Sequence, residues 1–211
     1  MQLTKFRHSC VRVDDGDRAL VLDPGLFSDV APALDGVDAV LITHEHADHV
    51  DPDALRAAAK ANSSLRVYAP AAVRETFADL GDQVTAVGPG ETFQAAGFDV
   101  RTFGGQHAVI HPLVPVIANV GYLIDGAVYH PGDSFAVPQA PVSVLLLPAV
   151  APWSKISETI DFAIAVRAPK AYPIHDAIVN DYFHGILQNM LKPLAERYAV
   201  DFGSFADPVS A

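Results

Sequence analysis

The hydrophobic positions of this chain fall in short runs that are separated by turn residues. Runs of this kind predict β-strands, and they are expected at residues 3–5, 10–13, 19–22, 37–42, 65–69, 84–87, 91–94, 98–103, 121–124, 127–130, 142–147 and 171–174. The run at 37–42 is interrupted only by Asp38, so it reads as a buried strand. The sequence therefore predicts a protein rich in short strands.

Helical signals lie between these strands and after them. Asp51 is a good N-cap with Pro52 at the first helical position, which predicts a helix through about Ala61. Three more helices are expected at 71–80 before Gly81, from Ser154 or Ser157 to about Arg167, and at 186–198.

The order of these elements predicts the fold class. Strands come mostly in hairpins, and Asp125-Gly126 between two apolar runs is the clearest hairpin signal. Two mixed β-sheets covered by helices on the outside therefore fit better than a doubly wound parallel sheet. We expect an α+β protein that forms one domain over residues 1–211, because neither a repeat nor a linker interrupts the chain.

Net charge and cysteine content narrow the classes of partner and the compartment. A formal net charge of -11 argues against nucleic acid, which is bound by surfaces rich in Lys and Arg. Cys10 is the only cysteine, so no intramolecular disulfide forms. Residues 1–10 lack the apolar stretch of a secretory signal, which favours a cytoplasmic protein.

One charge-free stretch, residues 134–154, is long enough to raise the question of a membrane span. It contains four prolines that would break a helix repeatedly: Pro138, Pro141, Pro148 and Pro152. We therefore expect a buried strand with loops at both ends and no membrane partner.

A histidine-rich motif follows the strand expected at 37–42. It places three histidines and an aspartate within six positions, as His44, His46, Asp48 and His49. Imidazole and carboxylate together suit Zn²⁺ and its first-row neighbours. A strand that ends in such a loop holds these side chains in fixed geometry, which indicates a metal site.

Three later strands also end near a side chain that can bind a metal. Gly104-Gly105 leads to His107, the strand at 127–130 leads to Asp133, and the strand at 171–174 leads to His175. His111 is an alternative to His107, because on an extended segment both would share a face. We favour His107, since it directly follows the glycine pair.

These residues resemble the H-x-H-x-D-H motif and the distant His, Asp and His of the metallo-β-lactamase superfamily. The resemblance implies a four-layer αββα sandwich with a binuclear metal site at one edge. It further implies that His44, His46 and His107 bind one ion and that Asp133 bridges both ions. The ligands that it implies for the second ion are Asp48, His49 and His175.

Residues Arg7 to Val11 resemble the opening GHSxxxI of a small branch of this superfamily. That branch includes L-ascorbate-6-phosphate lactonase and many metal-dependent hydrolases. A role in antibiotic hydrolysis is disfavoured, because the chain lacks the cysteine ligand of many β-lactamases and an export signal. His46 stands where the flavodiiron branch needs a carboxylate, which disfavours redox chemistry of that type.

The ligand set predicts a binuclear metal-dependent hydrolase. Two divalent ions about 3.5–4 Å apart can share a bridging hydroxide and lower the pKa of its parent water. This suits a small-molecule ester, lactone, thioester or phosphodiester, with Asp48 as the catalytic group that orients the hydroxide or takes its proton. Zn²⁺ is the expected ion, with Mn²⁺, Fe²⁺ or Co²⁺ as alternatives. The rival hypotheses are a mononuclear iron enzyme of the persulfide-dioxygenase type and a non-catalytic metal-binding module.

Several residues around this motif keep two interpretations. His8 and His111 are candidate substrate contacts, and each is alternatively a structural or loop histidine. Asp23 either supports a ligand histidine or only shapes the turn before Pro24. Trp153 lines a substrate mouth or, more in keeping with its type, packs in the core or in an oligomer contact. The apolar segment 112–117 is either an acyl-binding lip or an interface, so a homo-oligomer stays open.

Overall fold

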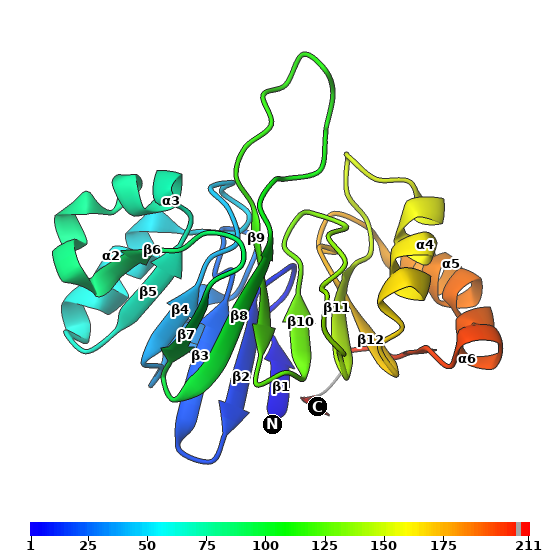
Figure 1. Ribbon diagram of the computed structural model, residues 1–211, viewed down its shortest axis with the longest axis horizontal. Coiled ribbons are helices and arrows are strands. Elements are labelled where there is room, and N and C mark those ends of the chain that lie inside the picture. Colours follow the sequence, from blue (N-terminus) through cyan, green and yellow to red (C-terminus); the bar gives the residue numbers. More distant parts are fainter. Residues whose placement is uncertain (206–207) are drawn as a thin grey trace.

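The computed structural model describes residues 1–205 and 208–211, and two β-sheets form its centre (Figure 1). The first sheet has seven strands: β1 (Gln2–Lys5), β2 (Val11–Asp15), β3 (Arg18–Leu22), β4 (Ala39–Leu41), β5 (Arg66–Ala69), β6 (Val84–Ala86) and β14 (Val209–Ser210). Their order across the sheet is β14-β1-β2-β3-β4-β5-β6, in which β3 to β6 are parallel and the other pairs antiparallel.

The second sheet also has seven strands: β7 (Thr92–Ala95), β8 (Phe98–Gly104), β9 (Val120–Ile124), β10 (Val128–His130), β11 (Val144–Pro148), β12 (Lys170–Ile174) and β13 (Asp201–Phe202). Their order is β13-β12-β11-β10-β9-β8-β7. β9 pairs antiparallel with both β8 and β10, and β10 to β13 are parallel. β8, β10 and β12 therefore run in the same direction and end at the same edge of the sheet.

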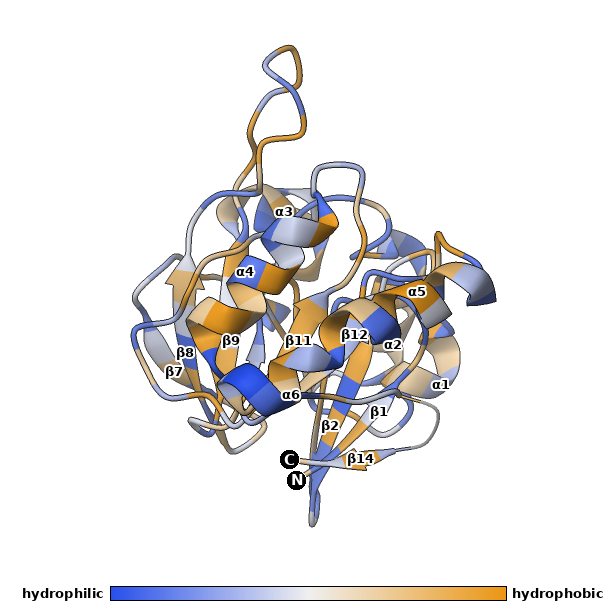
Figure 2. Ribbon diagram, turned by 90° about the vertical axis from the view of Figure 1, so that its right-hand side faces the viewer, coloured by the Kyte–Doolittle hydropathy of each residue, from blue (hydrophilic) through white to orange (hydrophobic). Residues whose placement is uncertain are grey.

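Helices cover the outer faces of both sheets (Figure 1). Those on the first sheet are α1 (Val30–Leu34), α2 (Pro52–Ala61), α3 (Ala71–Thr76) and the 3₁₀-helix η1 (Ala78–Gln83). Those on the second sheet are α4 (Ile156–Val166), α5 (Asp181–Leu191) and α6 (Pro193–Tyr198), which Figure 2 shows lying across its strands. This arrangement confirms the α+β sandwich of two mixed sheets with flanking helices.

The hydrophobic core has three layers, as a four-layer sandwich requires. Strand β11 shows why, because it is buried on both faces. Leu146 points to the central cluster between the sheets, together with Leu22 and Tyr122. Leu145 and Leu147 point the other way, into the cluster beneath α4 and α5. A third cluster lies between the first sheet and its helices.

The helix boundaries differ from expectation in three places. The helix expected at 71–80 is divided into α3 and η1, which meet at Phe77. The one expected at 186–198 begins earlier, capped by the Asn180 side chain, and is divided before Pro193, which has no N–H to donate to the preceding turn. The N-cap of α4 is Lys155 and neither Ser154 nor Ser157.

Within the described ranges, no helix is long and apolar enough to cross a membrane. The charge-free stretch 134–154 contains β11 with loops before it and after it, as expected.

Candidate metal centre

The predicted ligands come together at one edge of the sandwich, because their strands all end there. The motif of residues 43–49 follows β4 in the first sheet. In the second sheet, β8 leads to His107, β10 to Asp133 and β12 to His175. The ligands therefore come from both sheets.

The side chains at this edge form two groups, and in each group the potential ligand atoms lie within 4.8 Å of one another. The first group contains His44, His46, His107 and Asp133. The second contains His8, Asp48, His49 and His175. All seven predicted ligands are present, and His8 joins the second group. The roles of the individual ligands stay predictions.

Asp133 lies between the two groups. Its Oδ1 is 3.1 Å from His49 Nε2, and its Oδ2 is 3.1 Å from His175 Nε2. Oδ2 is also 3.3 Å from His107 Nε2 in the first group. One carboxylate thus approaches ring nitrogens of both groups, which is the position that a bridging ligand needs.

The hydrogen bonds of three histidines fix which nitrogen faces the centre. In each ring Nδ1 donates to an oxygen, so the neutral ring presents the lone pair of Nε2 to the centre, as metal-binding histidines do. The acceptors are Asp23 Oδ2 for His49 (2.7 Å), Ala108 O for His107 (2.6 Å) and Val150 O for His175 (2.7 Å).

Asp23 supports the centre from behind the ligands. Its fully buried carboxylate accepts hydrogen bonds from the Thr43 backbone N–H and hydroxyl, both at 2.7 Å, and from His49. The Thr43 hydroxyl in turn accepts from His44 Nδ1 at 2.9 Å, which directs His44 Nε2 to the first group. Asp23 therefore orients one histidine of each group, and with a φ of +45° it also shapes the turn.

Unpartnered buried atoms at the centre fit a cation. Among the described residues, His49 Nε2, His107 Nε2 and Asp133 Oδ1 are buried without a hydrogen-bond partner. His49 Nε2 and Asp133 Oδ1 are 3.1 Å apart, and their lone pairs repel each other when the ring is neutral. A proton on His49 Nε2 or a cation between the two atoms relieves this repulsion. Ligands of one tetrahedral Zn²⁺ lie about 3.3 Å apart, given bonds of about 2.0–2.2 Å. The donor set and spacing therefore fit divalent metal ions.

Carboxylates raise the pKa values of two histidines in the second group. Burial lowers the pKa of His49, but the carboxylates of Asp133 and Asp23 outweigh it and raise that pKa well above its ordinary value. Burial also lowers the pKa of His175. Hydrogen bonds to Asp133 and Asp48 outweigh this effect and raise that pKa to about 9. Protons and metal ions therefore compete for the same nitrogens.

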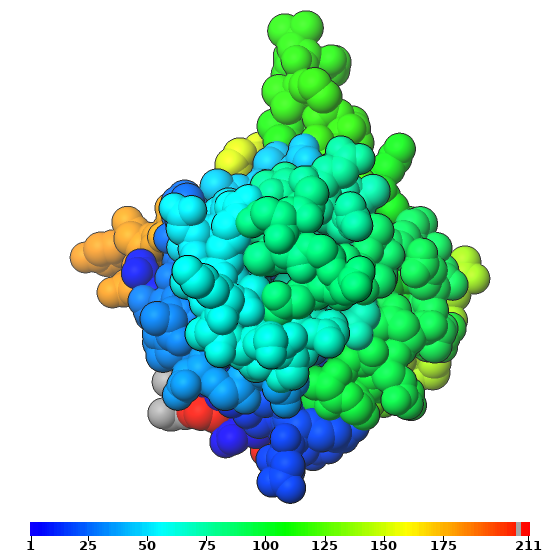
Figure 3. All heavy atoms as spheres, turned by 90° about the vertical axis from the view of Figure 1, so that its left-hand side faces the viewer, coloured from blue at the N-terminus to red at the C-terminus, as the bar shows by residue number. Residues whose placement is uncertain are grey.

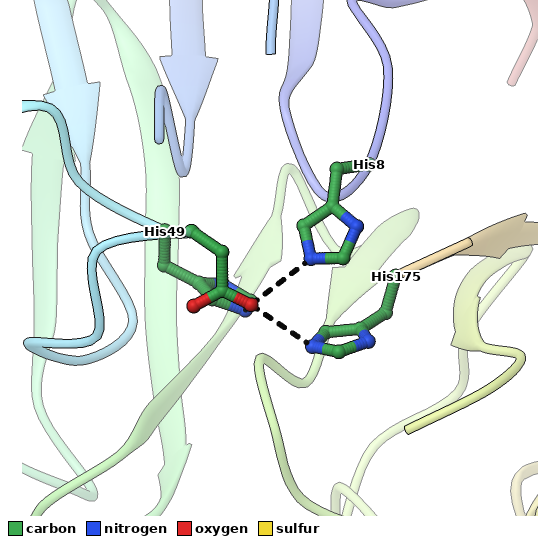
Figure 4. Close-up of side chains that lie close together, drawn as sticks. His8, His49 and His175 are labelled. Carbon is green, nitrogen blue, oxygen red and sulfur yellow. Dashed lines mark hydrogen bonds and ion pairs between the residues drawn. The ribbon is translucent and has the colours of Figure 1, made fainter. Parts of the chain in front are cut away.

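Asp48 stays ionised in this environment. Burial raises the pKa of Asp48, but hydrogen bonds from His175 and His8 have the larger, opposite effect. The pKa of Asp48 therefore lies well below its usual range. Figure 4 shows His8 and His175 converging on one carboxylate oxygen, which is Oδ2 of Asp48, at 3.1 and 3.4 Å. His49 Nε2 approaches the same oxygen at 3.8 Å.

His8 is fully buried beside this carboxylate. Its Nδ1 accepts the Ala177 backbone N–H at 3.3 Å, so the proton of the neutral ring is on Nε2 and points to Asp48. Arg7 and His8 both have positive φ, at 65° and 43°, which shows a strained turn held in place by these contacts. A direct substrate contact for His8 stays a prediction.

His111 lies outside both groups, and its side chain is exposed. It belongs to a loop of residues 105–119 that projects from the molecule (Figures 1 and 3). The loop starts at the centre, where Ala108 N–H donates to Asp133 O at 2.8 Å and His107 N–H to Ile117 O at 3.0 Å. Its exposed apolar side chains include Val109, Ile110, Leu113, Val114 and Val116.

Two residues contact Asp133 in a way that the sequence did not predict. The Trp153 indole Nε1–H donates to Asp133 Oδ2 at 2.8 Å. Asn119 Oδ1 accepts the Asp133 backbone N–H at 3.0 Å. The polar N–H of an indole in a loop after a strand was a usable signal for Trp153. Asn119 carried no signal, because its contact with Asp133 depends on how the residue before β9 packs against the turn after β10.

Comparisons with known proteins agree with this geometry. The family model described as Beta-lactamase superfamily domain matches residues 2–175. Protein Rv0786c of Mycobacterium tuberculosis is 43% identical over 199 residues, and the match covers 92% of this chain and 92% of that protein. UPF0173 protein PF0020 of Pyrococcus furiosus is 30% identical, and 83% of each chain is covered. The solved structure of Igni18, a metallo hydrolase from Ignicoccus hospitalis, has a TM-score of 0.74 at 20% identity and covers 99% of this chain and 97% of its own.

The chain therefore belongs to the metallo-β-lactamase superfamily and, within it, to the UPF0173 family of metal-dependent hydrolases. The Igni18 structure shows the shared fold.

Proposed function

We propose that this protein is a hydrolase that uses two divalent metal ions to cleave a small-molecule ester, lactone or phosphodiester. The observation that carries the proposal is the position of Asp133, whose carboxylate approaches ring nitrogens of both histidine groups at 3.1–3.3 Å. The relatives support the reaction class, since the UPF0173 protein of Aeropyrum pernix is named a metal-dependent hydrolase.

The first ion would be held by His44, His46 and His107, and the second by Asp48, His49 and His175, with Asp133 between them. When bound, two such ions lower the pKa of a water molecule towards neutrality and polarise the oxygen of the scissile group. Zn²⁺ is the ion that suits this set of imidazole and carboxylate donors, and Mn²⁺ and Fe²⁺ are alternatives.

Asp48 has the geometry of a group that orients the attacking water. Its contacts with His8, His49 and His175 all use Oδ2, which leaves Oδ1 for a water molecule or the substrate. The side chain is 21% exposed, so this group is reached from solvent. Its low pKa keeps it charged at neutral pH, so it accepts a hydrogen bond from water throughout the physiological range.

Metal content tests the binuclear centre. We expect close to two Zn²⁺ or Mn²⁺ ions per chain in protein purified without chelator, and fewer in Asp133→Ala and His175→Ala. His184→Ala is the matched control, because His184 is partly exposed and lies outside both groups. One iron per chain, together with sulfite production from a persulfide, would instead support a dioxygenase.

A substrate screen tests the reaction. Esters, thioesters, phosphodiesters and lactones are incubated with the metal-loaded protein, and a phosphorylated sugar lactone is included because of the resemblance to L-ascorbate-6-phosphate lactonase. We expect turnover in at least one class that is abolished in Asp48→Ala and retained in His184→Ala. A protein that binds two ions and cleaves nothing in this screen would support a non-catalytic metal-binding module.

A further inference from the structure

The loop between β11 and α4, residues 149–155, reaches the metal centre at two points. The carbonyl of Val150 accepts the Nδ1–H of His175 at 2.7 Å. Three residues further along, the indole Nε1–H of Trp153 donates to Asp133 Oδ2 at 2.8 Å. An indole has one N–H and no acceptor, so this contact uses its whole hydrogen-bonding capacity.

The indole also packs against aromatic side chains. The ring of Phe135 lies against Trp153 with a centroid separation of 5.1 Å, and Phe135 in turn packs on Phe162 of α4 at 5.1 Å. The His107 ring meets Trp153 edge-on at 5.9 Å. Trp153 therefore links the core beneath α4 to the ligands of the centre.

The Asp133 carboxylate needs such a restraint. The terminal torsion of an aspartate is broad, so the carboxylate rotates unless hydrogen bonds fix it. Its Oδ1 is a buried atom without a hydrogen-bond partner among the described residues. Three side chains approach Oδ2: His107, His175 and Trp153. The two histidines are predicted metal ligands, so the Trp153 N–H is the donor that stays available to hold Oδ2 when metal is bound.

We propose that Trp153 is a positioning residue of the metal centre, whose N–H holds the Asp133 carboxylate in the orientation that faces both ligand groups. This inference rests on the proposed two-ion function, and it concerns metal binding rather than the identity of the substrate. Hydrogen bonds to metal ligands from outside the coordination sphere are worth about 10–100-fold in metal affinity.

Trp153→Phe tests the N–H, because it keeps an aromatic ring and removes the donor. Phe135→Leu is the matched control, because it disturbs the packing against the indole and keeps the donor. Metal-free protein is titrated with Zn²⁺ against a chromophoric chelator, and thermal unfolding of each metal-free variant checks its fold. We expect Trp153→Phe to weaken binding of one or both ions about 10–100-fold. Phe135→Leu should retain the affinities of the unmodified protein.

A second measurement needs no variant, because Trp153 is the only tryptophan of the chain. Co²⁺ bound within contact distance of Asp133 should quench the tryptophan emission, and the quenching should saturate at the stoichiometry of Co²⁺ binding. Unchanged emission on stoichiometric binding would contradict the contact between Trp153 and the centre.

The outcomes separate this inference from the proposed function. Failure of the unmodified protein to bind two ions would overturn both. Binding of two ions with equal affinity by the unmodified protein and by Trp153→Phe would overturn the role of Trp153 alone. An equal loss of affinity in Phe135→Leu would assign the effect to packing and overturn the role of the N–H.

Discussion

Asp23 shows how a residue that is not a predicted ligand governs the centre. Its carboxylate accepts hydrogen bonds from Thr43 and His49 with no exposure to solvent. In Asp23→Asn an NH₂ group replaces one acceptor oxygen, so His49 loses the partner that keeps its proton on Nδ1. We expect the Zn²⁺ affinity of the second group to fall about 10–100-fold.

The Zn²⁺ titration of Asp23→Asn is compared with that of Asp38→Asn, which makes the same change at an exposed position. Equal affinities in the two variants would contradict the role assigned to Asp23.

Cys10 allows a prediction about pH. The thiol has no solvent exposure, and burial, reinforced by nearby carboxylates, raises its pKa far above the ordinary value. The thiol of the unfolded chain ionises with a pKa of about 8.5, whereas the thiol of the folded protein stays protonated to much higher pH. The contribution of Cys10 to the free energy of unfolding is therefore complete below about pH 8.5 and is lost as the pH rises above that value. We expect native protein to resist a thiol reagent at pH 8 and denatured protein to react with one equivalent.

The free energy of unfolding should also fall more steeply above pH 9 in the unmodified protein than in Cys10→Ala, which lacks the ionising group. Rapid stoichiometric labelling of the native protein would contradict this burial.

At the scale of elements, the turn after β10 depends on Gly132, which precedes Asp133. Its φ is +63°, and an added Cβ would lie 2.3 Å from Asn119 Oδ1 and 2.6 Å from Thr43 Cβ. Gly126 has a φ of +64° with nothing within 4 Å, so it is a matched control. We expect Gly126→Ala to cost about 1–2 kcal/mol from its backbone conformation. Gly132→Ala should cost about 1–3 kcal/mol more from overpacking.

Urea denaturation of both variants measures this difference. Zn²⁺ affinity should fall only in Gly132→Ala, because the turn presents Asp133 to the centre. Equal stability losses would show that the turn accommodates a side chain.

The elements that carry ligands were readable in the sequence because each ends a buried apolar run with a metal-binding side chain. The elements that were missed are short: α1, β13 and β14. Their stability comes from tertiary contacts rather than local pattern, as is general for short elements. The contact of Trp153 with Asp133 joins residues 20 positions apart through the packing of two loops, which periodicity does not encode.

At the scale of the whole molecule, the centre joins the two sheets. His44, His46, Asp48 and His49 follow a strand of the first sheet, and His107, Asp133 and His175 follow strands of the second. Ions held between them would bind the folded state and not the unfolded chain, so they stabilise the fold by about 4 kcal/mol at a metal concentration of a thousand times Kd. We therefore expect chelation to lower the melting temperature and added Zn²⁺ to restore it.

Thermal unfolding of ligand variants tests whether the ions connect the two sheets. His175→Ala removes a ligand from the second sheet, so added Zn²⁺ should raise its melting temperature less than that of the unmodified protein. His184→Ala should respond to Zn²⁺ fully, because His184 lies outside both groups. If Zn²⁺ left the melting temperature of the unmodified protein unchanged, the ions would not join the sheets. The first group by itself already contains residues from both sheets. Partial stabilisation of His175→Ala by Zn²⁺ would therefore indicate that one ion is enough to connect the two sheets.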